Sequence, residues 1–422
     1  MNTELKKRFL GSTVWTAFAF FFFQGLTLVT NLIVSKFIGA EHYGIFSFIT
    51  TTAQLLGLVC SLGIHFILPK VLGAGNADNA KIISYSNFIT KIFAAIAIII
   101  FIAFNKLAID VVGIRELPIP VLLFSALLIY SYPRSFVQTA IITGLFKYKF
   151  LLWTNLFKGV TIILTTVIST HFFDVSGAII GFSVSFFVCN FITDILIDKY
   201  VCHYTHTKIS IKNILKDPEL IKLIKLSVPA VLTSFVVLFA NWFVNRLMLG
   251  FPGGLKELGV YNMVNQLKLF LLFIPFTLVN VITPLMSAAQ HVKSQQRKIL
   301  IVAILVTSFF NISFCIITQL FSSEIMNILG DNLENYHSTL SVSMWGTYIY
   351  AVTLIMGSYF IVKEKMMIGL MINTLWSILF IAISYYLIYS GYGSLGIAWS
   401  NLISYVFLIF VISFYIFKFR NA

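Results

Sequence analysis

Apolar residues in this chain occur in long runs that are interrupted by short polar segments, rather than in the alternating pattern of a soluble sheet. A run of about 20 apolar residues is the length that an α-helix needs to cross the hydrocarbon core of a bilayer. Cutting the runs at glycine, proline and charge clusters predicts twelve such helices. Their predicted cores are residues 13–34, 45–68, 82–104, 118–142, 151–170, 177–197, 226–248, 260–288, 299–320, 338–361, 366–389 and 395–416. The run 260–288 contains Pro275 and Pro284, and we expect it to be tilted or kinked.

Composition supports an all-α polytopic membrane protein. Hydrophobic residues make up 59% of the 422 residues and charged residues only 10%. Because a soluble domain carries about a quarter of charged residues, this balance excludes the ordinary globular classes. The mean hydropathy of +0.94 agrees with that assignment.

The formal net charge of +14 raises the question of a nucleic-acid partner. With the N-terminus in the cytoplasm, however, the short cytoplasmic loops hold 20 Lys and Arg residues and the outer loops hold 4. Positive residues accumulate in cytoplasmic loops of membrane proteins, so this asymmetry predicts that both termini are cytoplasmic. It also accounts for most of the charge, and we expect no nucleic-acid binding.

The helices divide into two groups of six around a polar segment, residues 198–225, which we interpret as a basic cytoplasmic linker. We therefore predict an N-terminal six-helix lobe at 1–197 and a C-terminal six-helix lobe at 226–422. At a constant offset of 215 residues, Gly39 and Gly44 match Gly254 and Gly259. An even number of spans separates the two copies, so the repeat is parallel, with an axis along the membrane normal.

The span count, the two bundles of six, the GAEHYGIF turn that starts at Gly39 and the GLFKYKF turn that starts at Gly144 together resemble a known group. They are similar to the O-antigen (polysaccharide repeat-unit) flippases of the multidrug/oligosaccharidyl-lipid/polysaccharide flippase superfamily. This resemblance implies a multi-pass protein of the bacterial inner (plasma) membrane, without cofactors. It also implies that the protein moves an undecaprenyl-diphosphate-linked oligosaccharide, a repeat unit for lipopolysaccharide O-antigen or a similar surface polysaccharide, to the outer leaflet.

The same resemblance implies alternating access coupled to an ion gradient, of H⁺ or Na⁺. Expected partners are the lipid-linked oligosaccharide, membrane lipid and possible polysaccharide polymerase and chain-length proteins. The chain lacks the GxxxxGK[ST] phosphate-binding loop, and this agrees with transport that does not use ATP.

Five cations lie inside predicted spans, whereas Asp194 is the single acid there and is placed near a cytoplasmic helix end. An unpaired cation at the bilayer centre costs about 2.5–3.5 kcal/mol on insertion scales. One peripheral acid cannot pair with five cations, so we expect the cations to snorkel or to face a water-filled cavity that receives an anion. The candidate substrate-binding residues are Arg134, Lys91, Lys158, Lys268 and Arg246.

Helix position separates these five candidates. Arg134, Lys91 and Lys158 lie on the order of 12–15 Å from the cytoplasmic ends of their helices at 1.5 Å per residue, which is beyond easy snorkelling reach. Arg246 lies near an outer helix end and is expected to snorkel, and Lys268 fits a cavity or a structural contact equally well. The planar guanidinium of Arg134 suits the diphosphate linkage because it can bind two phosphate oxygens.

Polar residues recur at helical spacing beside these cations, for example Thr154, Lys158 and Thr161. A polar stripe on an apolar helix faces protein or water rather than lipid. The alternative interpretation is that these side chains, Arg134 included, only hold neighbouring helices together.

Two other functions remain open at this stage. One is a non-transporting membrane scaffold of a polysaccharide assembly complex, and the other is a drug or organic-cation antiporter of the same superfamily, which the basic interior disfavours. Catalytic triads, paired carboxylates and Cys or His clusters at metal-ligand spacing are absent from the sequence. We therefore predict neither an enzyme nor a metal site.

Overall fold

The computed structural model describes residues 3–73, 79–103, 119–201, 218–288, 293–363 and 365–418, and all of its regular elements are helical. The chain forms two compact units. The first consists of residues 1–30 and 45–238, and the second of residues 31–44 and 239–422. Residues 202–217, most of the predicted linker, lie outside the described residues, and the predicted lobe boundaries stay a prediction.

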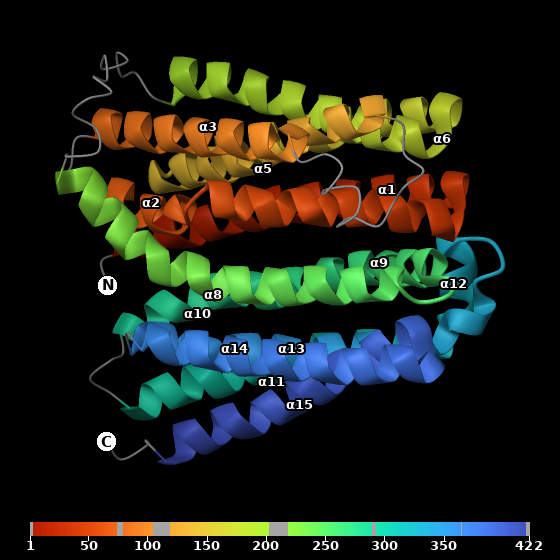
Figure 1. Ribbon diagram of the computed structural model, residues 1–422. Coiled ribbons are helices and arrows are strands. Elements are labelled where there is room, and N and C mark those ends of the chain that lie inside the picture. The colour runs from red at the N-terminus through yellow and green to blue at the C-terminus, as the bar shows by residue number, and fades with distance from the viewer. Residues whose placement is uncertain are drawn as a thin grey trace. The chain divides into compact units, whose positions relative to one another are not determined.

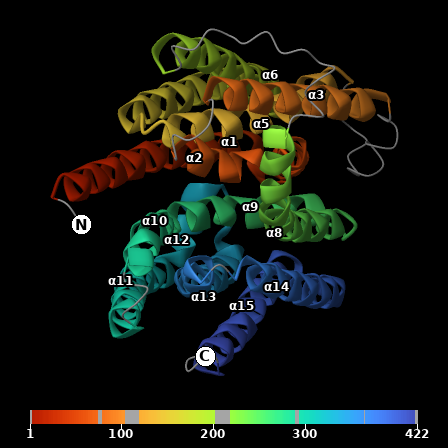
Figure 2. The ribbon, with the colours of Figure 1, turned by 90° about the vertical axis from the view of Figure 1, so that its left-hand side faces the viewer.

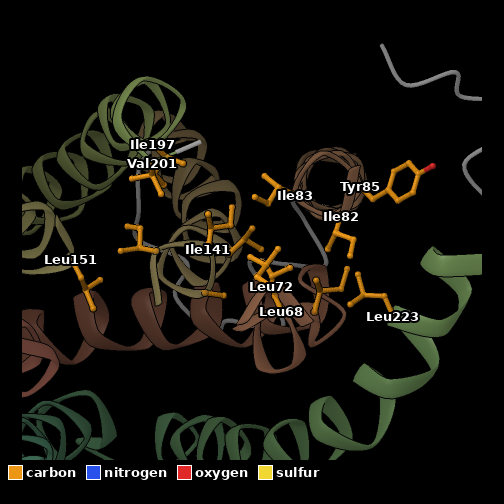
Figure 3. Packing of buried hydrophobic residues seen from close by; sticks show 14 of the residues in the cluster. Leu68, Leu72, Ile82, Ile83, Tyr85, Ile141, Leu151, Ile197, Val201 and Leu223 are labelled. Atoms are coloured by element: carbon orange, nitrogen blue, oxygen red, sulfur yellow. The ribbon is translucent and has the colours of Figure 1, made fainter. Parts of the chain in front are cut away.

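The first unit is built from α2, α3, α5 and α6 together with parts of α1 and α8. The bounds of these helices are α1 Thr3–Cys60, α2 Ile64–Gly73, α3 Asn79–Ala103, α5 Ile119–Gly144, α6 Tyr148–Tyr200 and α8 Pro218–Leu249. Helix α5 packs against α2, α3 and α6, and Figure 1 shows α3, α5 and α6 running alongside one another. Leu68, Leu72, Ile141 and Leu223 belong to its apolar core (Figure 3).

The second unit contains residues 31–44 of α1, the end of α8 and the helices that follow. Their bounds are α9 Gly254–Leu271, α10 Phe273–Ala288, α11 Lys293–Leu320, α12 Ser322–Leu329, α13 His337–Val362, α14 Met366–Leu387 and α15 Gly393–Lys418. Helix α13 packs against α10, α11 and α15, and Figure 2 shows it between α11 and α15.

Several of these helices contain breaks that separate two predicted spans. Gly39 interrupts α1 with a left-handed backbone (φ 75°), and Phe173 and Asp174 interrupt α6. A third break, at Gly391 and Gly393, lies between α14 and α15. Among the described residues, seven helical stretches are long and apolar enough to cross a membrane, or eight if one bent pair is counted as a span. The all-helical polytopic class is therefore confirmed.

The predicted kink in 260–288 is confirmed. It separates α9 from α10 at Leu272, with a bend of 40°. Pro275 follows three residues later. A proline lacks the N–H that would bond to the carbonyl four residues earlier, and its ring crowds that carbonyl, so the bend one turn before Pro275 is expected.

The predicted helix 45–68 was wrong in one respect, because it is broken. Helix α1 ends at Cys60, and α2 starts at Ile64 after a turn that contains Leu62 (φ 47°) and Gly63 (φ 68°). A β-carbon on Gly63 would lie 2.7 Å from the β-carbon of Val231 on α8. The close approach of α8 and the left-handed backbone both require glycine, and hydropathy carries neither signal.

Candidate functional site

Three helices of the first unit bring a set of polar side chains together. Helix α3 supplies Asn87, α5 supplies Arg134 and Gln138, and the segments of α6 before and after its break supply Lys158 and the pair Asn190 and Asp194. Arg134 is 2% exposed and Lys158 is 3% exposed, so both cations lie inside the helix bundle. We call these six residues the buried polar network.

Arg134 forms an ion pair within this network. Its Nη2 lies 2.5 Å from Oδ2 of Asp194, and its Nη1 donates to Oδ1 of Asn87 over 2.9 Å. Asp194, the single acid within the predicted spans, is therefore the acidic partner of Arg134. The reason is geometric: Asp194 lies only six residues before the end of α6, but it reaches the side chain of Arg134 on the neighbouring helix.

Lys158 is held by neutral oxygen atoms. Its Nζ donates to Oε1 of Gln138 over 2.9 Å, to Oδ1 of Asn190 over 2.8 Å and to Oγ of Ser135 over 3.4 Å. These three bonds use all three ammonium protons. The positive charge of Lys158 is thus solvated by protein dipoles.

Gln138 and Asn190 join the two cations into one network. Gln138 Nε2 donates to Oδ1 of Asp194 and to the backbone carbonyl of Asn190, both over 2.7 Å. Asn190 Nδ2 donates to the carbonyl of Ser131 over 3.0 Å. That carbonyl lies just before Pro133, within α5. The network therefore connects α3, α5 and both segments of α6, which rationalises why polar residues occur in four apolar segments.

The other candidate cations lie elsewhere. Lys91 is exposed on α3 and lies one turn after Asn87, so the structure does not bring it into the buried polar network. Arg246, at the end of α8, is partly buried. Lys268 is 9% exposed in the second unit, and its Nζ lies 5.5 Å from the ring centroid of Tyr261. This contact is within the range of a cation–π interaction.

Sequence reasoning missed two members of the network. Asp194 was treated as an interfacial residue, and Asn190 was not singled out. A usable signal was present, because Asn190 and Asp194 are spaced i, i+4 in an otherwise apolar helix and therefore share one face. Gln138 and Asn87 belong to polar stripes on α5 and α3 that the sequence predicts to face protein or water.

The model of the family described as polysaccharide biosynthesis protein matches residues 9–290. The chain belongs to this family. The match covers α1 to α10 and therefore includes the whole buried polar network. No curated protein matches the chain.

Solved structures share the fold of this polysaccharide biosynthesis protein. The lipid II flippase MurJ in an inward closed conformation superposes with a TM-score of 0.76 at 15% identity, covering 97% of this chain and 88% of that one. An inward-facing multidrug resistance MATE family transporter of the MOP superfamily gives 0.75 at 14% identity, covering 94% and 96%. A MOP superfamily transporter from Pyrococcus furiosus gives 0.69 at 14% identity, covering 97% and 96%. At these identities the likeness establishes a transporter fold and nothing finer.

Proposed function

We propose that the chain moves an undecaprenyl-diphosphate-linked oligosaccharide, an O-antigen or similar surface-polysaccharide repeat unit, from the cytoplasmic to the outer leaflet. The observation that carries the proposal is the family match over residues 9–290. A transporter fold shared with a protein named as a lipid II flippase supports it. The chain would be a multi-pass protein of the bacterial inner membrane with cytoplasmic termini.

The buried polar network supplies the anion-binding chemistry of this proposal. Arg134 and Lys158 are cations inside a helix bundle, where burying a charge costs free energy. Their presence there indicates a role in function or in holding the helices together. A guanidinium binds phosphate oxygens through two parallel N–H donors. We therefore keep Arg134 and Lys158 as the proposed diphosphate-binding residues, whereas Lys91, Arg246 and Lys268 stay predictions. Ion coupling, to H⁺ or Na⁺, is proposed with the transport cycle.

The proposal is tested by lipid analysis of a strain that lacks the gene. We expect diphosphate-linked oligosaccharide to accumulate on the cytoplasmic side and surface polysaccharide to disappear. A plasmid copy carrying Arg134→Ala should leave both defects in place at normal protein level, and Arg134→Lys should partly restore export. Arg297→Ala, which removes an exposed arginine on α11, is the matched control and should restore export fully.

The alternatives give different results in the same assay. A non-transporting scaffold of a polysaccharide polymerase complex predicts no accumulation of lipid-linked oligosaccharide on the cytoplasmic side. A drug or organic-cation antiporter predicts normal surface polysaccharide and a change in drug sensitivity. Accumulation in the gene-deleted strain together with full rescue by Arg134→Ala would keep the flippase function and assign Arg134 to helix packing.

A further inference from the structure

One of the three guanidinium nitrogens of Arg134 has no acceptor among the described residues. Its Nη1 and Nη2 contact Asn87 and Asp194, but its Nε is buried and, within the described part of the chain, has no hydrogen-bond partner. A buried N–H of a charged group that lacks an acceptor is destabilising, because the group has lost its hydration without gaining a hydrogen bond. Such a cost is reduced when a further acceptor oxygen reaches Nε.

The charges of the buried polar network do not cancel. With their ordinary charges, Arg134 and Lys158 each contribute one positive charge and Asp194 contributes one negative charge. Asp194 pairs with Arg134, while the three contacts of Lys158 are to neutral oxygens. The network therefore holds an excess of one positive charge inside the bundle, which favours a second anion.

Asp194 is the member of the ion pair that reaches the surface. Its side chain is 28% exposed, whereas the side chain of Arg134 is 3% exposed. An anion that approaches Arg134 from this side meets the carboxylate first. Since Nη2 and Oδ2 are already in contact, a phosphate can use the same edge of the guanidinium only after Asp194 has moved away.

We propose that Asp194 is a built-in competitor that occupies the phosphate position at Arg134 and is exchanged for the diphosphate of the lipid carrier during each transport cycle. This inference rests on the proposed flippase function. A site with two buried cations and no competing carboxylate would bind a diphosphate tightly and release it slowly. A tethered carboxylate lowers that affinity because it must be displaced first, and it restores the ion pair when the substrate leaves.

The first test is a binding measurement on the purified full-length protein in lipid nanodiscs, with farnesyl diphosphate as the probe and farnesol as the uncharged control. Asp194→Asn keeps an acceptor for Gln138 but removes the competing charge. We expect it to bind farnesyl diphosphate at least tenfold more tightly than the unmodified protein, without a change for farnesol. Asp198→Asn, one turn further along α6 and exposed, should leave both affinities unchanged.

The second test measures flipping of lipid-linked oligosaccharide in reconstituted vesicles. Slower product release predicts that Asp194→Asn lowers KM and kcat together, whereas a purely structural role for Asp194 predicts a lower amount of folded protein with KM unchanged. Unchanged or weaker binding of farnesyl diphosphate by folded Asp194→Asn would overturn the proposal. If the unmodified protein flips no lipid-linked oligosaccharide, the proposed function itself fails.

A double variant keeps the proposal testable if Asp194→Asn does not fold. Replacing both partners, as Arg134→Gln with Asp194→Asn, removes both charges of the ion pair together, so neither of the two is left buried without the other. We expect this protein to fold and to bind farnesyl diphosphate at least tenfold more weakly than the unmodified protein. Binding as tight as that of the unmodified protein would show that Arg134 does not contact the diphosphate, and the proposal would be wrong.

Discussion

Gly44 and Gly259 face each other across a close contact between two helices of the second unit, and neither position has room for a side chain. A β-carbon on Gly44 would collide with the carbonyl oxygen of Leu255, and one on Gly259 would collide with that of Ala40. The offset of 215 residues that relates Gly44 to Gly259 also relates Ala40 to Leu255. The contact is therefore reciprocal, as at a two-fold axis, and it is consistent with the predicted parallel repeat.

This contact predicts that neither glycine tolerates a methyl group. The colliding atoms belong to the backbone, so Gly44→Ala and Gly259→Ala can be accommodated only if the two helices move apart. We expect each variant to lose about 1–3 kcal/mol of stability, as over-packed sites do. Thermal unfolding in detergent measures this loss. Gly357→Ala on α13 is the control, because a β-carbon there has no neighbour within 4 Å, and its Tm should stay level or rise.

The break in α6 predicts a stabilising substitution. Asp174 has φ 50° and ψ −134°, which is nearly the conformation of Gly393 (φ 52°, ψ −133°) at the break before α15. Side chains disfavour this region by about 1–3 kcal/mol. Asp174→Gly should therefore raise the Tm, and an unchanged or lower Tm would contradict the assignment of strain. Gly393→Ala should lower it, since a β-carbon there would also crowd the carboxylate of Glu257.

Substitutions of Glu257 should lower the stability of the second unit to different extents. Its Oε1 accepts from the hydroxyl of Tyr336 over 2.8 Å, and its Oε2 accepts from the backbone N–H of Ser394 over 2.7 Å, at the start of α15. Glu257→Ala removes both bonds and should cost about 1–3 kcal/mol. In Glu257→Gln the amide oxygen can still accept from the N–H of Ser394, and the NH2 can donate to the hydroxyl oxygen of Tyr336. This variant therefore keeps two contacts, one of them reversed, and loses the charge at a helix N-terminus, about 0.3–1 kcal/mol. Equal Tm values for the two variants would show that these bonds contribute nothing.

The hydrogen bond between Lys158 on α6 and Gln138 on α5 should make the effects of substituting these two residues on stability non-additive. Lys158→Met fills much of the same space but leaves the oxygens of Gln138 and Asn190 without their donor. We expect a loss of about 1–3 kcal/mol, because unsatisfied buried acceptors keep their desolvation cost. Adding Gln138→Leu to this variant should cost less than Gln138→Leu does alone. A double-mutant cycle measured by unfolding in detergent gives the coupling, and strict additivity would contradict it.

Hydropathy by itself determined the fold class of this protein. A bilayer requires about 20 apolar residues per helix, and such a run can be recognised from the local sequence alone. Most of the predicted cores therefore fall on helices of the described residues, while 45–68 and 260–288 each divide between two helices. The kink before Pro275 is equally local, because a proline disturbs the turn that precedes it. Buried cations could also be located, since Arg134 and Lys158 stand out in apolar runs.

Only the tertiary structure decided what those cations contact. Arg134 and Asp194 are 60 residues apart in the sequence. No local sequence pattern predicts that their side chains are in contact. Position along the helix alone placed Asp194 near a helix end, whereas its side chain contacts Arg134 on the neighbouring helix. The exposure of Lys91, one turn after Asn87 on α3, was undetermined for the same reason. How closely two helices approach at each turn depends on packing between them, and that is a property of the fold rather than of any one segment.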